Sequence, residues 1–304
     1  MNINDLKNEI LNNLPKNVKE FKRVFHGRGN FFEAYEYLTV DSIDNTLFVT
    51  FFNEINNETK NEIISILKEI TLLSNYENLL IQNRYDKDNL YEVIIGRIDE
   101  NLTANEFNLK YKLSFANQNI GFFADMKNGR KFAKRVAKNK KVLNLFSYTC
   151  SFSVAALSNQ ASLVVNVDMS KVSLNTGKIN HELNNLDLRK VKFLPFDILK
   201  SWSKIKKFAP YDMIIIDPPS FQKGSFEASR DYQKIVRRLD SLASQNCIVL
   251  SCLNDPKLDE EFIIDIFKEQ NPNFKYHSQL NNPKSFKSAK NSNALKNLIF
   301  TNYK

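Results

Sequence analysis

A short apolar run that ends in an acid and two prolines is the first part of the sequence that could do chemistry. Residues 213–216 read Met-Ile-Ile-Ile, which is typical of a strand covered on both faces. Asp217 follows, and Pro218 and Pro219 then stop the strand because they lack N–H donors and have a fixed φ. Ligands of open α/β sheets bind outside such strand ends. The stretch therefore predicts an acid and an aromatic residue, Phe221, in a binding crevice, although an ordinary strand followed by a proline turn explains the same residues.

Two more acids follow predicted strands. Asp168 comes after Val-Val-Asn-Val, and Asp197 comes after Phe-Leu-Pro-Phe. Carboxyl ends of parallel strands lie at one edge of a sheet, so we expect both acids to converge with Asp217 on one crevice. A carboxylate at the end of the second strand suits a ribose diol, and one after the third can accept from an adenine amino group. The alternative for each is a helix N-cap or a turn acid.

The second part of the chain alternates strands with helices from residue 141 onward. This alternation predicts a doubly wound parallel sheet of seven strands, and the two consecutive strands at the end predict an antiparallel hairpin on its edge. The predicted strands are 141–148, 162–168, 191–197, 211–217, 246–252, 274–280 and 295–303. The predicted helices between them are 151–160, 171–186, 229–244 and 258–270.

Residues 1–115 predict a smaller α+β domain, which leaves residues 116–304 for the larger one. Its predicted strands are 36–43, 46–54, 78–85, 90–98 and 107–115, with one amphipathic helix at 57–70. A basic helix is expected at 125–141. Its lysines 127, 131, 134 and 138 share one face, which suits either phosphate contacts or an ordinary solvated surface.

Composition narrows the class of partner. The formal net charge of +9 and a pI near 9.2 favour a polyanionic partner such as nucleic acid. Three cysteines make no disulfide framework in 304 residues, and the three histidines are too far apart for a metal motif, so no metal is expected. The N-terminus is polar and carries acids, and no apolar run approaches membrane length, so we expect a cytoplasmic protein without a membrane partner.

Four spaced segments together resemble a known family. They are VLNLFSYTCSFSVAAL, VVNVDMSK, FLPFDILKSW and IIIDPPSFQKG. They look like the successive cofactor motifs of class I S-adenosylmethionine-dependent methyltransferases. More closely, they resemble bacterial 23S ribosomal RNA methyltransferases that make 5-methylcytosine or methylguanine. The resemblance implies a Rossmann-like seven-stranded methyltransferase sheet, S-adenosyl-L-methionine as cofactor and RNA as partner. The first 115 residues look like the substrate-side domain that some members carry.

The resemblance also implies roles for individual residues. The cofactor's methionine end would lie against Asn144, Phe146, Tyr148 and Thr149, with Asp125 and Arg130 nearby. Asp168 would hold the ribose and Asp197 the adenine, whose ring would pack on Phe196 or Met169. One departure concerns the first loop, where the family usually has glycine and this chain has Cys150 and Ser151. Both are small enough for a close approach to the cofactor, but a positive φ is harder for them than for glycine.

Two chemistries fit the residues near the acceptor base. In amine methylation, Asp217 and the Pro218 carbonyl accept from an exocyclic amine while Phe221 stacks the flipped base. In carbon methylation, the Cys252 thiolate adds to C6 of cytosine and makes C5 nucleophilic. Cys252 is alternatively a small core residue, and the Leu-Asn-Asp-Pro after it does not match the usual surroundings of that nucleophile. The catalytic candidates are therefore Asp217, Pro218, Pro219 and Cys252, and the substrate-binding candidates are Ser220, Phe221, Lys223 and Arg230.

Other functions remain open at this point. A protein that kept the fold and binds RNA without turnover is one, because the first loop lacks glycine. A methyltransferase for a protein or a small molecule is another, which the basic charge weakly opposes. A nicotinamide dehydrogenase is disfavoured because no Gly-x-Gly-x-x-Gly follows the first strand of the larger domain.

Overall fold

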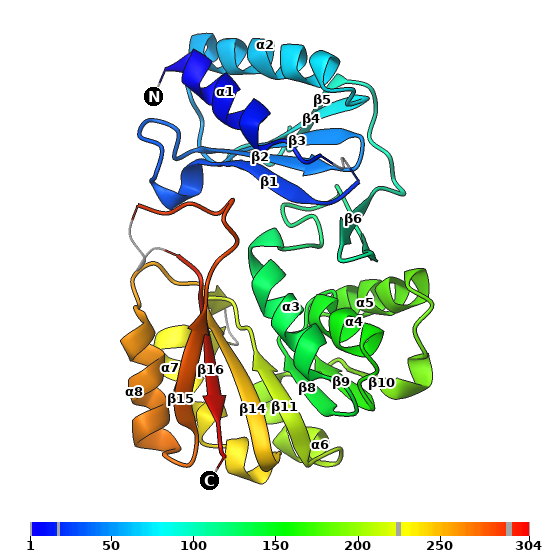
Figure 1. Ribbon diagram of the computed structural model, residues 1–304, viewed down its shortest axis with the longest axis vertical. Coiled ribbons are helices and arrows are strands. Elements are labelled where there is room, and N and C mark those ends of the chain that lie inside the picture. Colours follow the sequence, from blue (N-terminus) through cyan, green and yellow to red (C-terminus); the bar gives the residue numbers. More distant parts are fainter. Residues whose placement is uncertain (1, 17–18, 223–225, 290–293, 304) are drawn as a thin grey trace. The chain divides into compact units, whose positions relative to one another are not determined.

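The structure is a computed structural model in which residues 2–16, 19–222, 226–289 and 294–303 are described, without the Phe221 side chain (Figure 1). The chain forms two compact units. The first contains Met1–Ala124 together with Lys284–Asn291, and the second contains Asp125–Pro283 with Ser292–Lys304. This division lies further along the chain than residue 115. It also assigns part of the connection between the last two strands to the first unit.

The first unit is a five-stranded sheet in the order β1-β2-β3-β4-β5. Its strands are β1 Lys22–His26, β2 Leu38–Ile43, β3 Thr46–Phe51, β4 Asn78–Asn83 and β5 Tyr91–Ile95. Only β3 and β4 pair in parallel, because helix α2 (Asn57–Leu73) connects them. A small hairpin, β6 (Thr103–Glu106) and β7 (Leu109–Lys112), follows the sheet.

Helix α1 (Ile3–Asn13) is an element that the sequence pattern did not predict. Asn2 caps it by accepting from the Asp5 N–H, while the Asp5 side chain accepts from the Asn2 N–H. Leu6 and Ile10 are its fully buried residues, and they pack into one core with α2 and the sheet. Both helices cover the same face of this sheet (Figure 1). Two buried side chains among many polar ones make too weak a periodic signal to predict a helix.

The second unit is a seven-stranded sheet in the order β10-β9-β8-β11-β14-β16-β15, which confirms the predicted fold class. The strands are β8 Lys141–Leu145, β9 Leu163–Val167, β10 Val191–Leu194, β11 Tyr211–Ile216, β14 Ala243–Leu253, β15 Lys275–Leu280 and β16 Lys296–Thr301. The first five run parallel, and β16 inserts antiparallel between β14 and β15. The predicted hairpin is therefore present, with β15 outermost.

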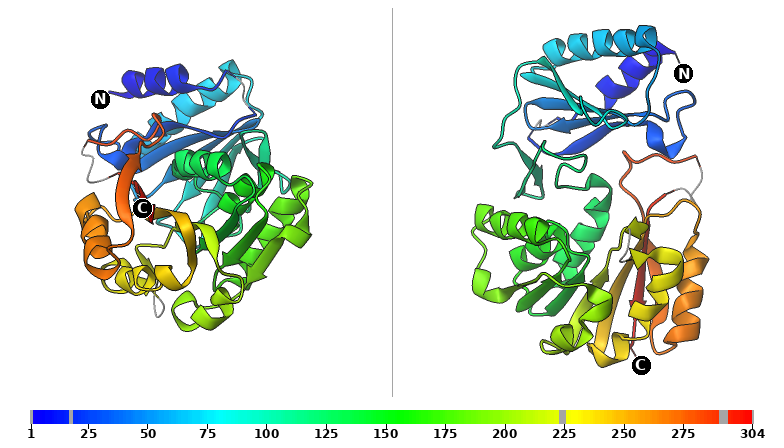
Figure 2. Two further views of the ribbon diagram at one scale, coloured as in Figure 1. Left: turned by 60° about the horizontal axis from the view of Figure 1, so that its bottom comes forward. Right: turned by 180° about the vertical axis from the view of Figure 1, so that it is seen from behind.

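Helices cover both faces of this sheet (Figures 1 and 2). One face carries α3 (Lys127–Val136), α4 (Ser151–Ser158) and α5 (Lys171–Leu183). The other carries α6 (Trp202–Lys206), α7 (Ala228–Val236) and α8 (Glu260–Gln270). Helix α7 is shorter than predicted, because the turn at Leu239–Ser241 ends it and Ala243 already begins β14. No helix in the described part of the chain is long and apolar enough to cross a membrane.

Candidate active site

The loop after the first strand of the larger sheet has an unusual backbone. Phe146, Tyr148 and Cys150 have φ values of 57°, 45° and 63°, all in the left-handed region. Such a conformation costs about 1 kcal/mol or more in a residue with a Cβ, and glycine normally supplies it. The positive φ that the sequence made doubtful at Cys150 is therefore adopted without glycine.

Helix α5 supports this loop from outside. The Asn180 Nδ2 donates to the Thr149 carbonyl at 2.9 Å, and both residues are buried. Gly177 lies against Cys150 so closely that a Cβ at Gly177 would be 2.4 Å from the Cys150 Sγ. Gly177 therefore makes room for the Cys150 side chain. Neither Gly177 nor Asn180 was predicted as a site residue, and the only sequence signal was that glycine is rare in this chain.

Asp168 ties the ends of two neighbouring strands together. Its Oδ2 accepts from the Tyr148 N–H at 2.8 Å, and its Oδ1 accepts from the Ser170 N–H at 2.8 Å. Burial raises the pKa of this carboxyl above its usual range. A carboxylate has about four lone-pair positions, so each oxygen can still accept one further hydrogen bond. That pair of acceptor oxygens suits the two hydroxyls of a ribose as donors.

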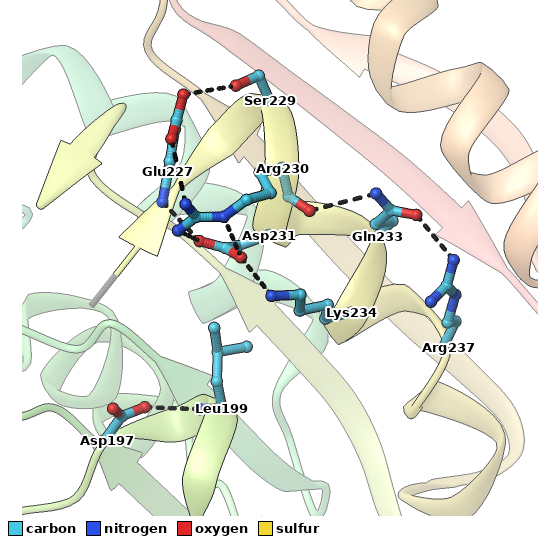
Figure 3. Close-up of polar contacts among 9 residues, drawn as sticks. All are labelled: Asp197, Leu199, Glu227, Ser229, Arg230, Asp231, Gln233, Lys234 and Arg237. Carbon is cyan, nitrogen blue, oxygen red and sulfur yellow. Dashed lines mark hydrogen bonds and ion pairs between the residues drawn. The ribbon is translucent and has the colours of Figure 1, made fainter. Parts of the chain in front are cut away.

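The residues expected around the adenine have mixed surroundings. Asp197 caps a short 3-10 turn, since its Oδ1 accepts from the Leu199 N–H at 2.9 Å (Figure 3). Lys200 pairs with its Oδ2 at 3.3 Å. The Phe196 ring lies under the Lys204 ammonium at 4.0 Å. Met169 is 47% exposed. The capping role that the sequence left open for Asp197 is present, and a role toward adenine stays a prediction.

Asn144 is directed into the protein interior. Its Nδ2 donates to the Asn166 Oδ1 at 2.9 Å, and Asn166 donates in turn to the Ser153 Oγ at 3.0 Å. Ser153 also contacts the buried His181 ring at 2.8 Å. This series of hydrogen bonds joins strand β8 to β9 and α4. Asn144 therefore stabilises the strand that leads into the loop. Phe146 packs against Phe226, with ring centroids 4.9 Å apart.

The end of strand β11 gathers ionisable side chains. Ile216 pairs with Ser251 in the β11–β14 register, so Asp217 and Cys252 follow side by side. Burial and the Asp125 carboxylate raise the pKa of Asp217 to about 7, against the opposite effect of the Arg130 guanidinium. Arg130 is a fully buried side chain of α3. The site thus holds a carboxyl that changes charge near neutral pH.

Cys252 is buried in the sheet core, with 1% of its surface exposed. Burial, followed by the Asp217 and Asp125 carboxylates, raises the pKa of its thiol well above the usual value. The Tyr232 hydroxyl donates to the Cys252 carbonyl at 3.1 Å and holds the strand end in place. These surroundings favour the neutral thiol of Cys252 over the thiolate.

The substrate-side candidates lie after the prolines. The Ser220 hydroxyl donates to the Asn254 carbonyl and links the turn to the end of β14. Arg230 is 63% exposed at its side chain but is paired with Asp231 at 2.8 Å and with Glu227 at 3.6 Å (Figure 3). Lys234 also binds Asp231, at 2.7 Å. Lys223 and the Phe221 side chain lie outside the described residues. Both basic residues of α7, Arg230 and Lys234, are therefore ion-paired with acids rather than arranged as unpaired charges for RNA phosphates.

A model of the S-adenosylmethionine-dependent methyltransferase family matches residues 22–301. The chain belongs to this family. The Bacillus subtilis protein YwbD, named a putative ribosomal RNA large subunit methyltransferase, is 29% identical over 280 residues, which are 87% of this chain and 69% of that protein. Ribosomal RNA large subunit methyltransferase I of Tolumonas auensis is 32% identical over 213 residues. The 213 aligned residues cover 65% of this chain and 52% of the relative, so the chain spans about half the length of this relative.

Solved structures agree on the fold. A putative S-adenosylmethionine-dependent methyltransferase from Streptococcus mutans superposes with a TM-score of 0.83 and 25% identity, covering 99% of this chain and 82% of that one. A structure of SMU.776 complexed with SAH also has a TM-score of 0.83, at 24% identity, and covers 98% of this chain and 79% of that one. The similarity to these structures thus covers residues of both units.

The cofactor of this methyltransferase is S-adenosylmethionine. The residues present fit it, because the loop 146–150 takes the tight backbone that a close approach needs and Asp168 keeps acceptor positions for a ribose. Asp217 follows strand β11, and β8 lies between β11 and β9 in the sheet. Among the described residues, no three His, Cys, Asp or Glu side chains are grouped to hold a metal ion.

The raised pKa of Asp217 predicts a pH dependence of folding. The folded protein binds this proton more tightly than the unfolded chain. The contribution of Asp217 to the free energy of unfolding is therefore fully present below pH 4 and is lost as pH rises toward about 7. In the Asp217→Asn variant we expect the free energy of unfolding to lose this decline between about pH 4 and pH 7. Urea unfolding over that range measures it. Equal pH slopes in the variant and the wild type would show that Asp217 titrates normally.

Proposed function

We propose that this methyltransferase transfers the methyl group of S-adenosylmethionine to a base of large-subunit ribosomal RNA. The observation that carries the proposal is that Asp217 and Cys252 directly follow the paired residues Ile216 and Ser251 at the ends of neighbouring strands, beside the predicted cofactor loop. Asp-Pro-Pro and cysteine are the groups that amine and carbon methylation of a base require. The relatives named as ribosomal RNA methyltransferases and the net charge of +9 support the same substrate.

The bound cofactor would supply a methyl group on a positively charged sulfur, which is already a strong electrophile. The protein's task is then to bring a nucleophilic atom of the base into line with that methyl group. Asp168 would hold the ribose end, and the 146–150 loop would fix the position of the reactive end. Pro218 and Pro219 would keep the backbone after Asp217 rigid, so that its carboxylate meets the base at a constant distance.

The two candidate reactions use Asp217 and Cys252 differently. In amine methylation, Asp217 would accept a hydrogen bond from the exocyclic N–H₂. The nitrogen would take the methyl as the methyl–sulfur bond breaks, and its proton would pass to the hydrogen-bonded Asp217 carboxylate. In carbon methylation, the Cys252 thiol would lose its proton and its sulfur would form a bond to C6. C5 would take the methyl as the methyl–sulfur bond breaks. The C5 proton would then pass to water, the C6–S bond would break, and the thiolate would be restored.

A methylation assay tests the proposal. Purified protein with tritium-labelled S-adenosylmethionine and protein-free ribosomal RNA should transfer label to the large-subunit RNA and not to the small-subunit RNA. If the rate of label transfer by Cys252→Ala falls about a thousandfold or more, the reaction is carbon methylation. If the rate stays within about tenfold of wild type, it is amine methylation. Label that enters protein or a small molecule, with none in either RNA, would overturn the proposed substrate.

A further inference from the structure

A basic and aromatic cluster in the first unit has no part in the site described above. The guanidinium carbon of Arg28 lies 4.4 Å from the centre of the Phe52 ring, and that of Arg84 lies 5.2 Å from the same centre. The negative face of an aromatic ring attracts a guanidinium, so one ring holds two positive groups. Arg28 follows β1, Phe52 follows β3 and Arg84 follows β4, so three strand ends meet here.

The backbone around Arg28 is built to present this side chain. Arg28 is the exposed middle residue of a Gly-Arg-Gly turn. A Cβ at Gly27 would lie 1.8 Å from the Tyr35 carbonyl oxygen, and one at Gly29 would lie 1.9 Å from the Lys287 carbonyl oxygen. Neither glycine can be replaced without moving the backbone, so the turn is packed in place and Arg28 projects from a fixed position.

Arg84 is held just as firmly from the other side. Its backbone N–H donates to the Phe51 carbonyl at 2.8 Å, and its guanidinium donates to the Asn119 Oδ1 at 3.2 Å. Burial and the nearby charge of Arg28 lower the pKa of Arg84. The two positive charges therefore repel one another, and the fold keeps them together.

No carboxylate neutralises this pair in the part of the chain that the structure describes. The ion pairs of this unit involve other basic residues, such as Arg23 with Asp41 at 2.5 Å and Lys287 with Glu9 at 2.6 Å. Two like charges held near one ring without a counter-charge favour an anionic ligand, because its binding relieves their repulsion. Guanidiniums suit phosphate in particular, since their planar N–H groups match two phosphate oxygens.

We propose that Arg28, Phe52 and Arg84 form a binding site for the phosphate backbone of the RNA substrate. This inference rests on the proposed function, because it assumes that the substrate is RNA. Phe52 acts as the support that sets the positions of both arginines. With guanidiniums over its ring, we assign it no stacking on a base, so the site takes phosphate and adds affinity without sequence preference.

The test is RNA affinity over a salt series. A fluorescein-labelled single-stranded RNA of mixed sequence is titrated with wild-type protein and with the Arg28→Ala, Arg84→Ala double variant, by fluorescence anisotropy. We expect at least about a tenfold weaker Kd in the double variant, because each arginine makes a charge-assisted contact. The slope of log Kd against log salt should fall by about 1.4, or ~0.7 for each lost phosphate contact.

Matched variants separate a specific site from general charge. The Arg189→Ala, Lys268→Ala variant removes two positive charges from exposed ion pairs, with Arg189 91% exposed, and should leave Kd and slope within about twofold. The Arg28→Lys, Arg84→Lys variant keeps both charges and should retain most of the slope. Calorimetric binding of S-adenosylmethionine should be unchanged in all variants, since none touches the cofactor residues.

The outcomes distinguish the two proposals. If wild-type protein neither binds nor methylates RNA, the proposed function fails. If wild-type protein binds RNA and the Arg28→Ala, Arg84→Ala variant matches its Kd and slope, this inference alone fails. Equal losses in the double variant and in the Arg189→Ala, Lys268→Ala variant would assign the effect to net charge and also overturn it.

Discussion

Asp168→Ala is expected to abolish measurable binding of S-adenosylmethionine. The substitution removes acceptors for the two ribose hydroxyls, each a hydrogen bond to a charged group that contributes about 1.5–3 kcal/mol. It also removes the acceptors of the Tyr148 and Ser170 N–H groups, both at 2.8 Å, which fix the predicted cofactor loop to β9. Together these losses weaken binding by about a hundredfold to ten-thousandfold. Isothermal titration calorimetry with the purified variant measures the loss.

Two control variants make this result specific. Asp187→Ala removes an acid of the same unit that is paired with Arg189 at 2.9 Å on the surface, and it should bind the cofactor like wild type. Asp197→Ala removes an acid whose oxygens already serve Leu199 and Lys200, so we expect a smaller loss than at Asp168. Wild-type affinity in Asp168→Ala, with the fold intact by circular dichroism, would remove Asp168 from the cofactor site.

Gly177→Ala is expected to damage cofactor binding from outside the loop. The new Cβ would lie 2.4 Å from the Cys150 Sγ, closer than a Cβ approaches another atom, and 3.0 Å from the Cys150 Cβ, which is also tight. Cys150 is fully buried and holds a positive φ, so it cannot move without shifting the loop 146–150. Overpacking of this kind costs about 1–3 kcal/mol of stability. Cofactor affinity should fall with it, because the displaced segment is the predicted cofactor loop.

A second substitution should reverse this damage. Cys150→Gly removes both side-chain atoms that a Cβ at position 177 would meet, and glycine adopts the positive φ without strain. We therefore expect Cys150→Gly with Gly177→Ala to regain most of the stability and cofactor affinity that Gly177→Ala alone loses. A double-mutant cycle, with urea unfolding and calorimetry on all four proteins, gives the coupling free energy.

A second glycine of the same unit serves as the control for the cycle. The atoms nearest a Cβ at Gly129 would be those of the Phe152 ring, at 3.2 Å, and of Leu250, not those of Cys150. Gly129→Ala should therefore combine additively with Cys150→Gly. Additive behaviour of Gly177→Ala with Cys150→Gly would show that the steric contact does not control the loop.

Local sequence patterns were sufficient to predict the strand ends at which the candidate site residues lie. Asp168, Asp197 and Asp217 each follow an apolar run, and a chain that alternates strands and helices can only bring such ends to one edge of a parallel sheet. The same local rules predicted the seven-stranded sheet and its terminal hairpin, both present in the structure. These features depend on residues close together in the chain, so local patterns are sufficient to predict them.

The contacts that support these residues could not be predicted from local patterns. The contact of Gly177 with Cys150, the bond from Asn180 to Thr149 and the convergence of Arg28 and Arg84 on Phe52 all join residues far apart in sequence. Helix α1 likewise depends on burial of Leu6 and Ile10 against the first sheet. The pKa of Asp217 depends on burial and on Asp125 and Arg130. Such contacts form only after the chain is packed, because their energies depend on distances that no local pattern specifies.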